Sequence, residues 1–499
     1  MTPRTSRRTF LLGTAGAAAT GAAALAGPSA AAASDTASDT VSADVVVVGG
    51  GLAGLTAARR LTAAGCSVVL LEARSRVGGR TLNHDIGNGK VAEAGGEFVG
   101  PTQNRIVALA SEVGVGTFDA YDTGNDVYVN GLLRLQYSDT GPLGTAPPDP
   151  LLLADIAKLT LQIDSLAKNV PPAAPWQAAN AAQYDSMTLE TWVRNNTLNG
   201  DGIVALLRPF TEALVGAEPG DLSMLFILAY VAAAGDENDP GTLERLMNVR
   251  GGAQQSRIVG GSQIISQKVA AELGSRVVLN APVRSITQSA TGVTVASDAL
   301  TVTARRAVVA VPPTLAARID YTPGLPPARD LLLQRLAMGA LMKVEAIYPT
   351  PFWRPAGLTG QFLTVGGPVG YSFDNSPPDG SPGIIAGFVG GRQNLTWGPK
   401  SPAERRAGVL AQFARIFQDD RFLSPADYFD MDWTAERWSR GGPTAIAGPG
   451  TLSQYGPALR APVGRIHWAG TETADYWQGY MDGAVRSGER AANEVAALL

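Results

Sequence analysis

Three glycines and a glutamate near the start of the chain have a spacing that indicates chemistry. Gly49, Gly51 and Gly54 fit the pattern G-x-G-x-x-G, and Glu72 comes at the end of the next apolar run. In a dinucleotide-binding turn, the first glycine permits the tight turn, the second lets a pyrophosphate approach the backbone, and the third allows close packing of helix and strand. A carboxylate about 20 residues further on binds ribose hydroxyls. This spacing predicts a site for a dinucleotide.

The surrounding segments predict the β-α-β unit that would position these residues. Val45 to Val48 is a β-branched apolar run, which is typical of a buried parallel strand. Leu52 to Ala64 consists mostly of good helix formers, so its free N–H groups and its dipole would face the phosphates. Gly65 is suited to end the helix, and Ser67 to Leu71 predicts the second strand.

Metal and acyl-transfer chemistry have little support in this sequence. His84 and His467 are its only histidines, and neither has Cys, Asp or Glu at a metal-ligand spacing, so we expect no metal site. No G-x-S-x-G nucleophile motif occurs. Cys66 is the single cysteine, which rules out an intrachain disulfide and favours a small core residue. Any redox chemistry would therefore depend on a cofactor.

The composition is that of a folded protein with no affinity for nucleic acid. Hydrophobic residues make up 45% of the 499 residues and charged residues 17%, enough apolar material for two substantial domains. The net charge is −4 and no basic patch interleaved with aromatic residues occurs, so we expect no nucleic-acid partner.

The N-terminal segment is predicted to be an export signal of residues 1–33. The sequence SRRTFLL, from Ser6 to Leu12, is a twin-arginine pattern, and a weakly apolar Ala/Gly stretch follows it. We expect the Tat export machinery as a partner and a secreted or extracytoplasmic location, with residues 34–43 as a flexible leader. A single membrane anchor is the alternative for this segment. The later part of the chain has no uninterrupted apolar run long enough to span a bilayer, so we expect no stable membrane insertion.

Motifs along almost the whole chain after Asp44 resemble those of the flavin-dependent monoamine oxidase family, in the family's order. They are EARSRVGGRT, AGGEFVGPTQNRI, VGGSQ, AVVAVPP, LMKVEAIYPTPFWR, GPGTLSQYG and RIHWAGTETADYWQGYMDGAVRSGERAA. The resemblance implies a flavoprotein that binds FAD and oxidises a small-molecule amine to an imine, which hydrolyses to a carbonyl product. It further implies that O2 becomes H2O2, and it suggests a homodimer.

The resemblance also implies the residues of the site. Lys343 would reach flavin N5 through a water and Tyr480 would form one wall of an aromatic substrate cage, so these are the expected catalytic residues. The residues expected to bind FAD are Gly49, Gly51, Leu52, Ala53, Gly54, Glu72, Ala73, Arg74, Gly79, Arg80, Gly95, Gly96, Glu97, Val283, Trp433, Gly470, Thr471, Glu472, Gly479, Tyr480 and Met481.

Two positions depart from the pattern of the mitochondrial members of that family. Gly442 stands where those members carry the cysteine that tethers FAD, so we expect non-covalent FAD. Pro443 stands where they carry the second cage tyrosine, and Trp477 or Phe98 could supply the missing wall. Pro443, Trp477, Phe98 and Tyr480 are therefore the expected substrate contacts.

The expected fold is α/β, with a discontinuous Rossmann-like FAD-binding domain and an α+β substrate domain that has a mixed sheet and a helical insert. The FAD-binding domain is assigned to residues 44–120, 241–325 and 431–499. The substrate domain is assigned to residues 121–240, which look helical, and to residues 326–430.

Three other functions stay open at this point. An L-amino-acid oxidase would share the fold, but such enzymes generally carry an arginine in the segment from Ala94 to Gln103, and none occurs here. A desaturase or dehydrogenase would pass electrons to an acceptor other than O2. A flavin-binding protein without turnover is the third alternative.

Overall fold

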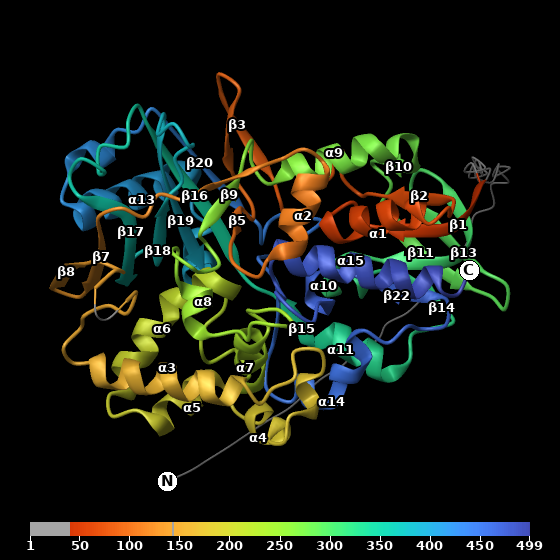
Figure 1. Cartoon of the computed structure of the whole chain (residues 1–499), viewed down its shortest axis with the longest axis horizontal. Helices are drawn as coiled ribbons and strands as arrows, with labels where there is room; N and C mark the ends of the chain where they lie inside the picture. Colours follow the sequence, from red (N-terminus) through yellow and green to blue (C-terminus); the bar gives the residue numbers. More distant parts are fainter. Residues whose placement is uncertain (1–39, 142–143) are drawn as a thin grey trace, which may run out of the picture. The chain divides into compact units, whose positions relative to one another are not determined.

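The structure is a computed structural model that describes residues 40–141 and 144–499. The predicted export signal and most of the predicted leader lie outside the described residues. An eight-stranded sheet, a seven-stranded sheet and a group of helices form a mixed α/β fold (Figure 1). The predicted α/β class is confirmed, whereas the domain boundaries stay predictions.

The eight-stranded sheet carries the glycine turn. Strand β1 (Thr40–Val48) pairs in parallel with β2 (Val68–Leu71) on one side and with β13 (Thr301–Val309) on the other. Strand β22 (Ile466–Trp468) pairs in parallel with β13. The strand order is β10 (Val277–Val278), β2, β1, β13, β12 (Val293–Ser297), β11 (Val283–Gln288) and β14 (Asp320–Thr322), with β22 outside this path.

The register of this sheet brings four distant segments to one edge. Val48 lies opposite both Leu71 and Val309, and Val309 lies opposite Trp468. Because the strands are parallel, the loops that follow these four residues all leave the sheet at its carboxyl edge. Ligands of open α/β sheets bind at this edge.

Val45 to Val48 of β1 are buried on both faces of the sheet. Val45 and Val47 belong to one hydrophobic core, and Val46 and Val48 belong to another. A strand covered on both faces needs the continuous apolar run that the sequence shows. Four helices contribute to the first core, namely α1 (Leu52–Ala63), α2 (Asn104–Glu112), α9 (Gln263–Leu273) and α15 (Met481–Ala496).

Strand β1 begins earlier than the sequence predicts. Residues Thr40 to Ala43, assigned to the flexible leader, pair in register with Thr301 to Ala304. The prediction was wrong for these residues because backbone hydrogen bonding along a neighbouring strand does not require apolar side chains. The long strand β13 provides that partner from a distant part of the chain.

The seven-stranded sheet combines segments from three parts of the chain. Its strands β16 (Leu341–Tyr348) and β19 (Gly383–Gly390) pair over their full length. Helix α13 (Pro402–Phe417) packs into the same hydrophobic core as this sheet. The order is β20 (Asp427–Asp432), β16, β19, β18 (Tyr371–Asp374), β17 (Leu358–Val365), β7 (Asn125–Asn130) and β8 (Leu133–Tyr137). Strands β7 and β8 lie in the segment 121–240 that was expected to be helical. The hairpin of β7 and β8 had a local signal that sequence reasoning missed, a two-residue loop beginning with Gly131, whereas the pairing of β7 with β17 joins distant segments and had none.

Helices occupy most of the segment between β8 and β9 (Ser256–Ile258). Every residue of α7 (Met224–Ala232) is buried, as expected for a helix that is apolar on all sides and surrounded by others. The neighbouring helices are α3 (Leu153–Ala167), α4 (Ala181–Asp185), α5 (Leu189–Asn196), α6 (Gly200–Val215) and α8 (Leu243–Met247). Among the described residues, no helix is both long enough and apolar enough to cross a membrane.

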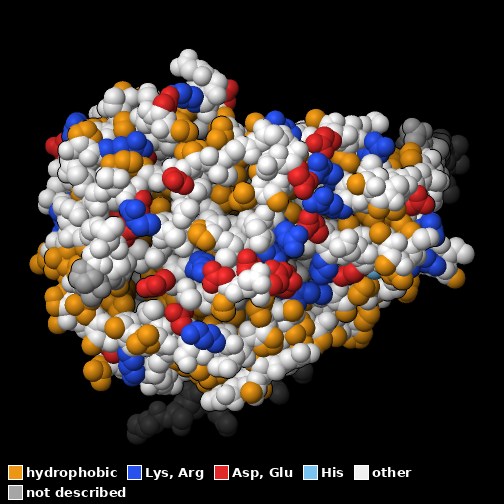
Figure 2. Space-filling view, viewed as in Figure 1, with side chains coloured by type: hydrophobic (Ala, Val, Ile, Leu, Met, Phe, Trp, Pro, Cys, Tyr) orange, Lys and Arg blue, Asp and Glu red, His pale blue; other side chains and the backbone are white. Residues whose placement is uncertain are grey.

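Shorter elements connect these parts. The small sheets consist of β3 (Asn83–Gly87) with β4 (Lys90–Glu93), of β15 (Leu336–Met338) with β21 (Ala445–Ala447), and of β5 (Phe98–Val99), β9 and β6 (Thr117–Asp119). The remaining α-helices are α10 (Pro313–Ala316), α11 (Pro327–Arg335), α12 (Gly391–Trp397) and α14 (Thr451–Tyr455). On the face in Figure 2, acidic and basic side chains lie intermixed. Arg60 of α1 forms ion pairs with Glu112 of α2 and with Glu489 of α15.

Gly54 provides a test of the close packing between α1 and the sheet. A Cβ atom at this position would lie 1.9 Å from the Gly49 carbonyl oxygen. We expect Gly54→Ala to lower the free energy of unfolding by about 2 kcal/mol or more, because the backbone must move to relieve the overlap. Denaturant unfolding measures this change. Gly324→Ala is the control, since no atom lies within 4 Å of the added Cβ there. Equal unfolding midpoints for the two variants would contradict this packing argument.

Candidate cofactor and active site

A cavity of about 420 Å³ collects residues from both sheets and from the helices between them. It is lined by the loops at the carboxyl edge of the eight-stranded sheet, by β16 and β18, and by α6 and α7. Of the residues predicted from the sequence, those that line it are Gly49, Gly51, Leu52, Ala53, Glu72, Ala73, Arg74, Gly79, Arg80, Gly95, Gly96, Glu97, Phe98, Val283, Lys343, Trp433, Pro443, Gly470, Thr471, Gly479, Tyr480 and Met481. Gly54, Glu472 and Trp477 do not line it.

The glycine turn forms an open backbone cradle at one end of this cavity. Gly51 and Gly79 face one another, and a Cβ atom on Gly79 would lie 3.2 Å from the Gly51 Cα. Side chains at these two positions would therefore narrow the cavity where the backbone is exposed to it. Helix α1 begins immediately after Gly51, so its unpaired N–H groups point toward the same space. This arrangement fits a pyrophosphate.

Glu72 lies in the wall beside this cradle. Its carboxylate accepts hydrogen bonds from the backbone N–H of Gly50, at 2.6 Å, and from that of Arg74, at 2.9 Å. A carboxylate can accept about four hydrogen bonds, so acceptor positions remain for hydroxyl groups of a ligand. The contact with Gly50 also ties the end of β2 to the glycine turn, which places the ribose-binding position next to the phosphate-binding position.

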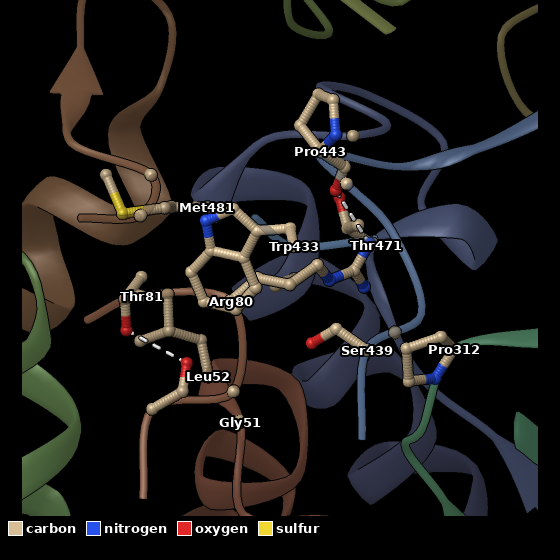
Figure 3. A pocket seen from close by; sticks show the side chains of 18 of the residues that line it. Gly51, Leu52, Arg80, Thr81, Pro312, Trp433, Ser439, Pro443, Thr471 and Met481 are labelled. Atoms are coloured by element: carbon tan, nitrogen blue, oxygen red, sulfur yellow. Dashed lines mark hydrogen bonds between the residues drawn. The ribbon is translucent and has the colours of Figure 1, made fainter. Parts of the chain in front are cut away.

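Arg80 is held in the cavity wall by Glu472. The Arg80 guanidinium contacts both Glu472 carboxylate oxygens, at 2.5 and 3.1 Å. It also donates to the Pro443 carbonyl at 2.8 Å (Figure 3). Burial would raise the pKa of Glu472, but the Arg80 guanidinium outweighs it and lowers that pKa below its usual range. Glu472 was predicted to contact the cofactor. The structure corrects this, because Glu472 lies behind Arg80 and orients it.

Lys343 lies among buried acidic groups where the cavity meets the seven-stranded sheet. Its Nζ is 2.8 Å from Glu97 Oε1 and 3.1 Å from Glu345 Oε1, and it donates to the carbonyl oxygens of Glu93 and Gly95. Burial would lower the pKa of Lys343, but the nearby carboxylates outweigh it and raise that pKa. The lysine is therefore a buried ammonium at neutral pH.

Sequence reasoning missed three of the charged residues near Lys343, namely Glu93, Glu345 and Arg257. Glu345 had a signal, because residues two apart on a strand share one face of the sheet. Arg257 on β9 had none, since its contact with Glu93 joins segments 164 residues apart.

Trp433 and Gly95 meet beside this cluster. The Trp433 indole N–H donates to the Ala94 carbonyl at 2.9 Å. A Cβ on Gly95 would lie 2.3 Å from the Arg80 carbonyl oxygen and 3.1 Å from the Trp433 ring. The absence of a side chain at Gly95 thus lets the tryptophan, the arginine backbone and the lysine approach the same part of the cavity.

Aromatic rings line the remaining part of the cavity. Tyr480 packs against Tyr230 of α7, with ring centroids 6.1 Å apart. Phe98 packs against Phe373 at 5.0 Å, and Tyr371 packs against Phe373 at 4.9 Å. Sequence reasoning missed Tyr230, Tyr371, Phe373, Phe388 and Phe210, which also line the cavity. They lie on α7, β18, β19 and α6, and no local pattern separates them from core residues.

The two candidates for the missing cage wall have different positions. Phe98 lines the cavity, and its contact with the substrate stays a prediction. Trp477 is buried behind Tyr480, with ring centroids 4.9 Å apart, and its indole N–H donates to Thr102 Oγ1 at 3.1 Å. The prediction of a substrate contact is therefore wrong for Trp477, which supports the Tyr480 ring from the side away from the cavity.

The fold and this site define a dinucleotide-binding flavoprotein, and comparison with known proteins agrees. Residues 52–496 match the family of flavin containing amine oxidoreductases. AofH of Mycobacterium tuberculosis, described as a putative flavin-containing monoamine oxidase, is 45% identical over 461 residues, covering 92% of this chain and 97% of that protein.

Solved structures agree with this match. A putrescine oxidase bound to putrescine has a TM-score of 0.86 and 33% identity, covering 92% of this chain and 100% of that chain. Cyclohexylamine oxidase from Brevibacterium oxydans IH-35A has a TM-score of 0.84 and 33% identity, covering 91% and 99%.

This chain belongs to the flavin containing amine oxidoreductase family. It is a flavin-containing amine oxidase, and the resemblance inferred from its motifs is confirmed. The glycine cradle, Glu72 and Arg80 would hold the dinucleotide part of the flavin cofactor. The cavity wall made by Gly95, Trp433 and Lys343 would hold its ring, and the aromatic side chains would face the amine.

Glu72→Ala tests the dinucleotide end of the site. The change removes the acceptor for the Gly50 and Arg74 N–H groups and for the ribose. Hydrogen bonds to a charged group contribute about 1.5–3 kcal/mol each, so we expect flavin affinity to fall about 100-fold or more. Flavin absorbance of the purified protein and reconstitution titrations measure it. Glu190→Ala, which removes a surface glutamate paired with Arg194, should retain full flavin. Full flavin in Glu72→Ala would contradict the ribose assignment.

Tyr480→Ala tests the aromatic end. The Tyr480 hydroxyl has no hydrogen-bond partner in the described part of the chain, so the ring face and the hydroxyl are both available to an amine. Burial of an aromatic ring against the apolar group of an amine contributes about 1.5 kcal/mol or more, so we expect kcat/KM to fall roughly tenfold. Steady-state kinetics with one amine substrate check this. Tyr480→Phe keeps the ring and should retain most activity. An unchanged alanine variant would place the substrate elsewhere.

Proposed function

We propose that this protein is an FAD-dependent oxidase of monoamines that carry an apolar group. It oxidises the bond between the amine nitrogen and its neighbouring carbon to an imine, which hydrolyses to a carbonyl product, and O2 is reduced to H2O2. The observation that carries the proposal is that one cavity joins the glycine cradle to a group of aromatic rings, with Lys343 in its wall. This aromatic chamber is lined by Tyr480, Tyr230, Phe98, Tyr371 and Phe373.

The residues of the chamber suit an uncharged amine. Tyr480, Tyr230 and Phe98 would bind its apolar group and exclude water from the reacting carbon. The amine must lose its ammonium proton before it gives up a hydride, and an apolar environment favours that neutral form. When bound, FAD supplies the hydride acceptor at its N5 and passes the electrons to O2. The water between Lys343 and flavin N5 stays a prediction of the resemblance, because the Lys343 ammonium already contacts four oxygen atoms of the protein.

The charges in the cavity wall favour a monoamine over a diamine. Among the described residues that line the cavity, the acidic ones are Glu72 and Glu97. Glu72 serves the glycine cradle, and Glu97 is paired with Lys343. A second ammonium group would then be buried among aromatic rings without a carboxylate partner, which is costly.

The charges in the cavity wall also argue against an L-amino-acid oxidase. A carboxylate on the substrate would need a cationic partner at the aromatic end. Lys343 is already surrounded by carboxylates there, and Arg80 is paired with Glu472. This agrees with the lack of arginine between Ala94 and Gln103.

Non-covalent binding of FAD is part of the proposal. Gly442 lines the cavity without a side chain that could form a bond to the flavin. Cys66 lies before β2, at the opposite end of that strand from Glu72, and is not among the lining residues. Export by the Tat machinery, an extracytoplasmic location and a homodimer stay predictions of the sequence and of the resemblance.

A panel of amines tests the proposal. We expect arylalkyl and cycloalkyl monoamines to bleach the flavin without oxygen, and one H2O2 to form for each amine consumed in air. Diamines and amino acids should react at least about tenfold more slowly, since a buried unpaired charge costs more than about 1.4 kcal/mol. Anaerobic absorbance and a coupled peroxide assay measure both steps. Acid denaturation should release soluble FAD.

The other outcomes of this panel identify the alternatives. Bleaching without peroxide in air would indicate a dehydrogenase that uses another acceptor. A flavin that stays oxidised with every amine would indicate a binding protein without turnover. A preference for diamines or for amino acids would overturn the proposed substrate class.

A further inference from the structure

Five buried charged groups form a cluster behind the wall of the cavity. They are Glu93 on β4, Glu97 before β5, Arg257 on β9, and Lys343 and Glu345 on β16, and none is more than 3% exposed. Lys343 and Glu97 line the cavity, whereas Glu345 lies one step behind Lys343 on the same face of the strand.

Arg257 neutralises Glu93. Its Nη2 pairs with Glu93 Oε2, and its Nη1 donates to the Ser376 carbonyl at 2.9 Å. The distance from Arg257 Nε to Glu97 Oε2 is longer, at 3.9 Å. Arg257 therefore contacts Glu93 directly and lies farther from Glu97. Lys343 is the cation in contact with the other two carboxyl groups, those of Glu97 and Glu345.

Lys343 thus faces two carboxyl groups at once. Glu97 Oε1 and Glu345 Oε1 both lie within 3.1 Å of its Nζ. The neutral Asn375 side chain donates to Glu345 Oε1 at 2.9 Å. Glu97 Oε2 and Glu345 Oε2 have no hydrogen-bond donor among the described residues. These two oxygens are the places where a proton can reside.

The cluster contains three carboxyl groups and two cations. If every group were ionised, one negative charge would remain uncompensated in a buried site. An unpaired buried charge is expensive, and such a group takes up a proton instead. Since Glu93 is matched by Arg257, the proton belongs to Glu97 and Glu345.

We propose that Glu97 and Glu345 share one proton beside Lys343, and that its loss places a negative charge next to the flavin ring. The O–H bond of the protonated carboxyl breaks in that step, and the proton passes to solvent. A negative charge at this position makes the flavin harder to reduce. Only this last effect rests on the proposed function, because the shared proton follows from the cluster alone.

The direction of the pKa values supports this assignment. Burial raises the pKa of Glu345 to about 7, against the opposing effect of Lys343, and burial also raises the pKa of Glu97. The pair therefore keeps a proton at a pH at which an ordinary carboxyl group has lost it, and the loss of that proton changes the cluster from neutral to negative. The other charged groups that face the pair are Glu93 and Arg257, which compensate one another, and Lys343, which stays an ammonium.

The midpoint potential of the bound flavin between pH 6 and pH 9 tests the inference. Chemical reduction is used, so that no amine titrates in the same range. We expect the wild-type potential to fall more steeply above pH 7 than below it. In Glu345→Gln the new side chain cannot ionise, and two carboxylates remain with two cations. We therefore expect the steeper fall of the potential above pH 7 to disappear in this variant. Glu97→Gln should behave in the same way, which guards against a folding defect in one variant.

Glu212→Gln is the matched control. Glu212 is also a buried carboxyl, with its pKa raised by burial to about 9, but it does not line the cavity. This variant should keep the wild-type slope. Asp122 and Asp126 also have pKa values raised by burial to about 7, so the infrared titration is read as the difference between the wild type and each glutamine variant, in which these two groups cancel. This difference should show a protonated carboxyl band that disappears near pH 7.

Two results would overturn the inference. One is a wild-type potential without the change in slope near pH 7. The other is a change in slope that persists in both glutamine variants, or a difference spectrum between the wild type and these variants that contains no carboxyl band. If the amine panel fails while the slope and the band behave as expected, the proposed function falls and the shared proton stands.

Discussion

The parallel pairing of β1 with β2 and β13 is the constraint on which the rest of the site depends. It aligns Val48, Leu71, Val309 and, through β22, Trp468 along one edge of the sheet. The loops after these residues carry the glycine turn, Glu72, the segment beginning at Ala310, and the segment that contains Arg80's partner Glu472. Without this register, segments from opposite ends of the sequence would not meet around one dinucleotide.

A second constraint is that the cations in the cavity wall, at the boundary between the two sheets, need carboxylate partners. Arg80 with Glu472, and Lys343 with Glu97 and Glu345, place cations in the wall while most of their charge is matched from behind. A cofactor that changes its charge during a reaction is sensitive to such groups, because burial lowers the local dielectric response. The two pairs differ in one respect, since Arg80 has one carboxylate partner and Lys343 has two.

The aromatic chamber shows how the family's architecture is adapted in this chain. Pro443 and Gly442 leave one side of the site without a large side chain, and rings from α7 and from the seven-stranded sheet enclose the space instead. Trp477 supports Tyr480 from behind. The substrate preference is therefore set by residues of several elements that share no motif, whereas the cofactor contacts lie in short, recognisable segments.

The sequence by itself predicted the glycine turn and Glu72 as parts of the site, because their spacing reflects the backbone geometry of a dinucleotide-binding turn. Lys343 and Tyr480 were implied by the resemblance of their segments to those of a known family. The sequence also determined the α/β class, through strand and helix patterns that each depend on neighbouring residues. Only the tertiary structure decided that Glu472 orients Arg80, that Trp477 lies behind Tyr480, and that β7 joins a sheet. It alone brought Arg257 and Glu93, from two other parts of the chain, to the strand that carries Lys343. These facts depend on contacts between distant segments, and the energies of such contacts leave no periodic pattern in one chain.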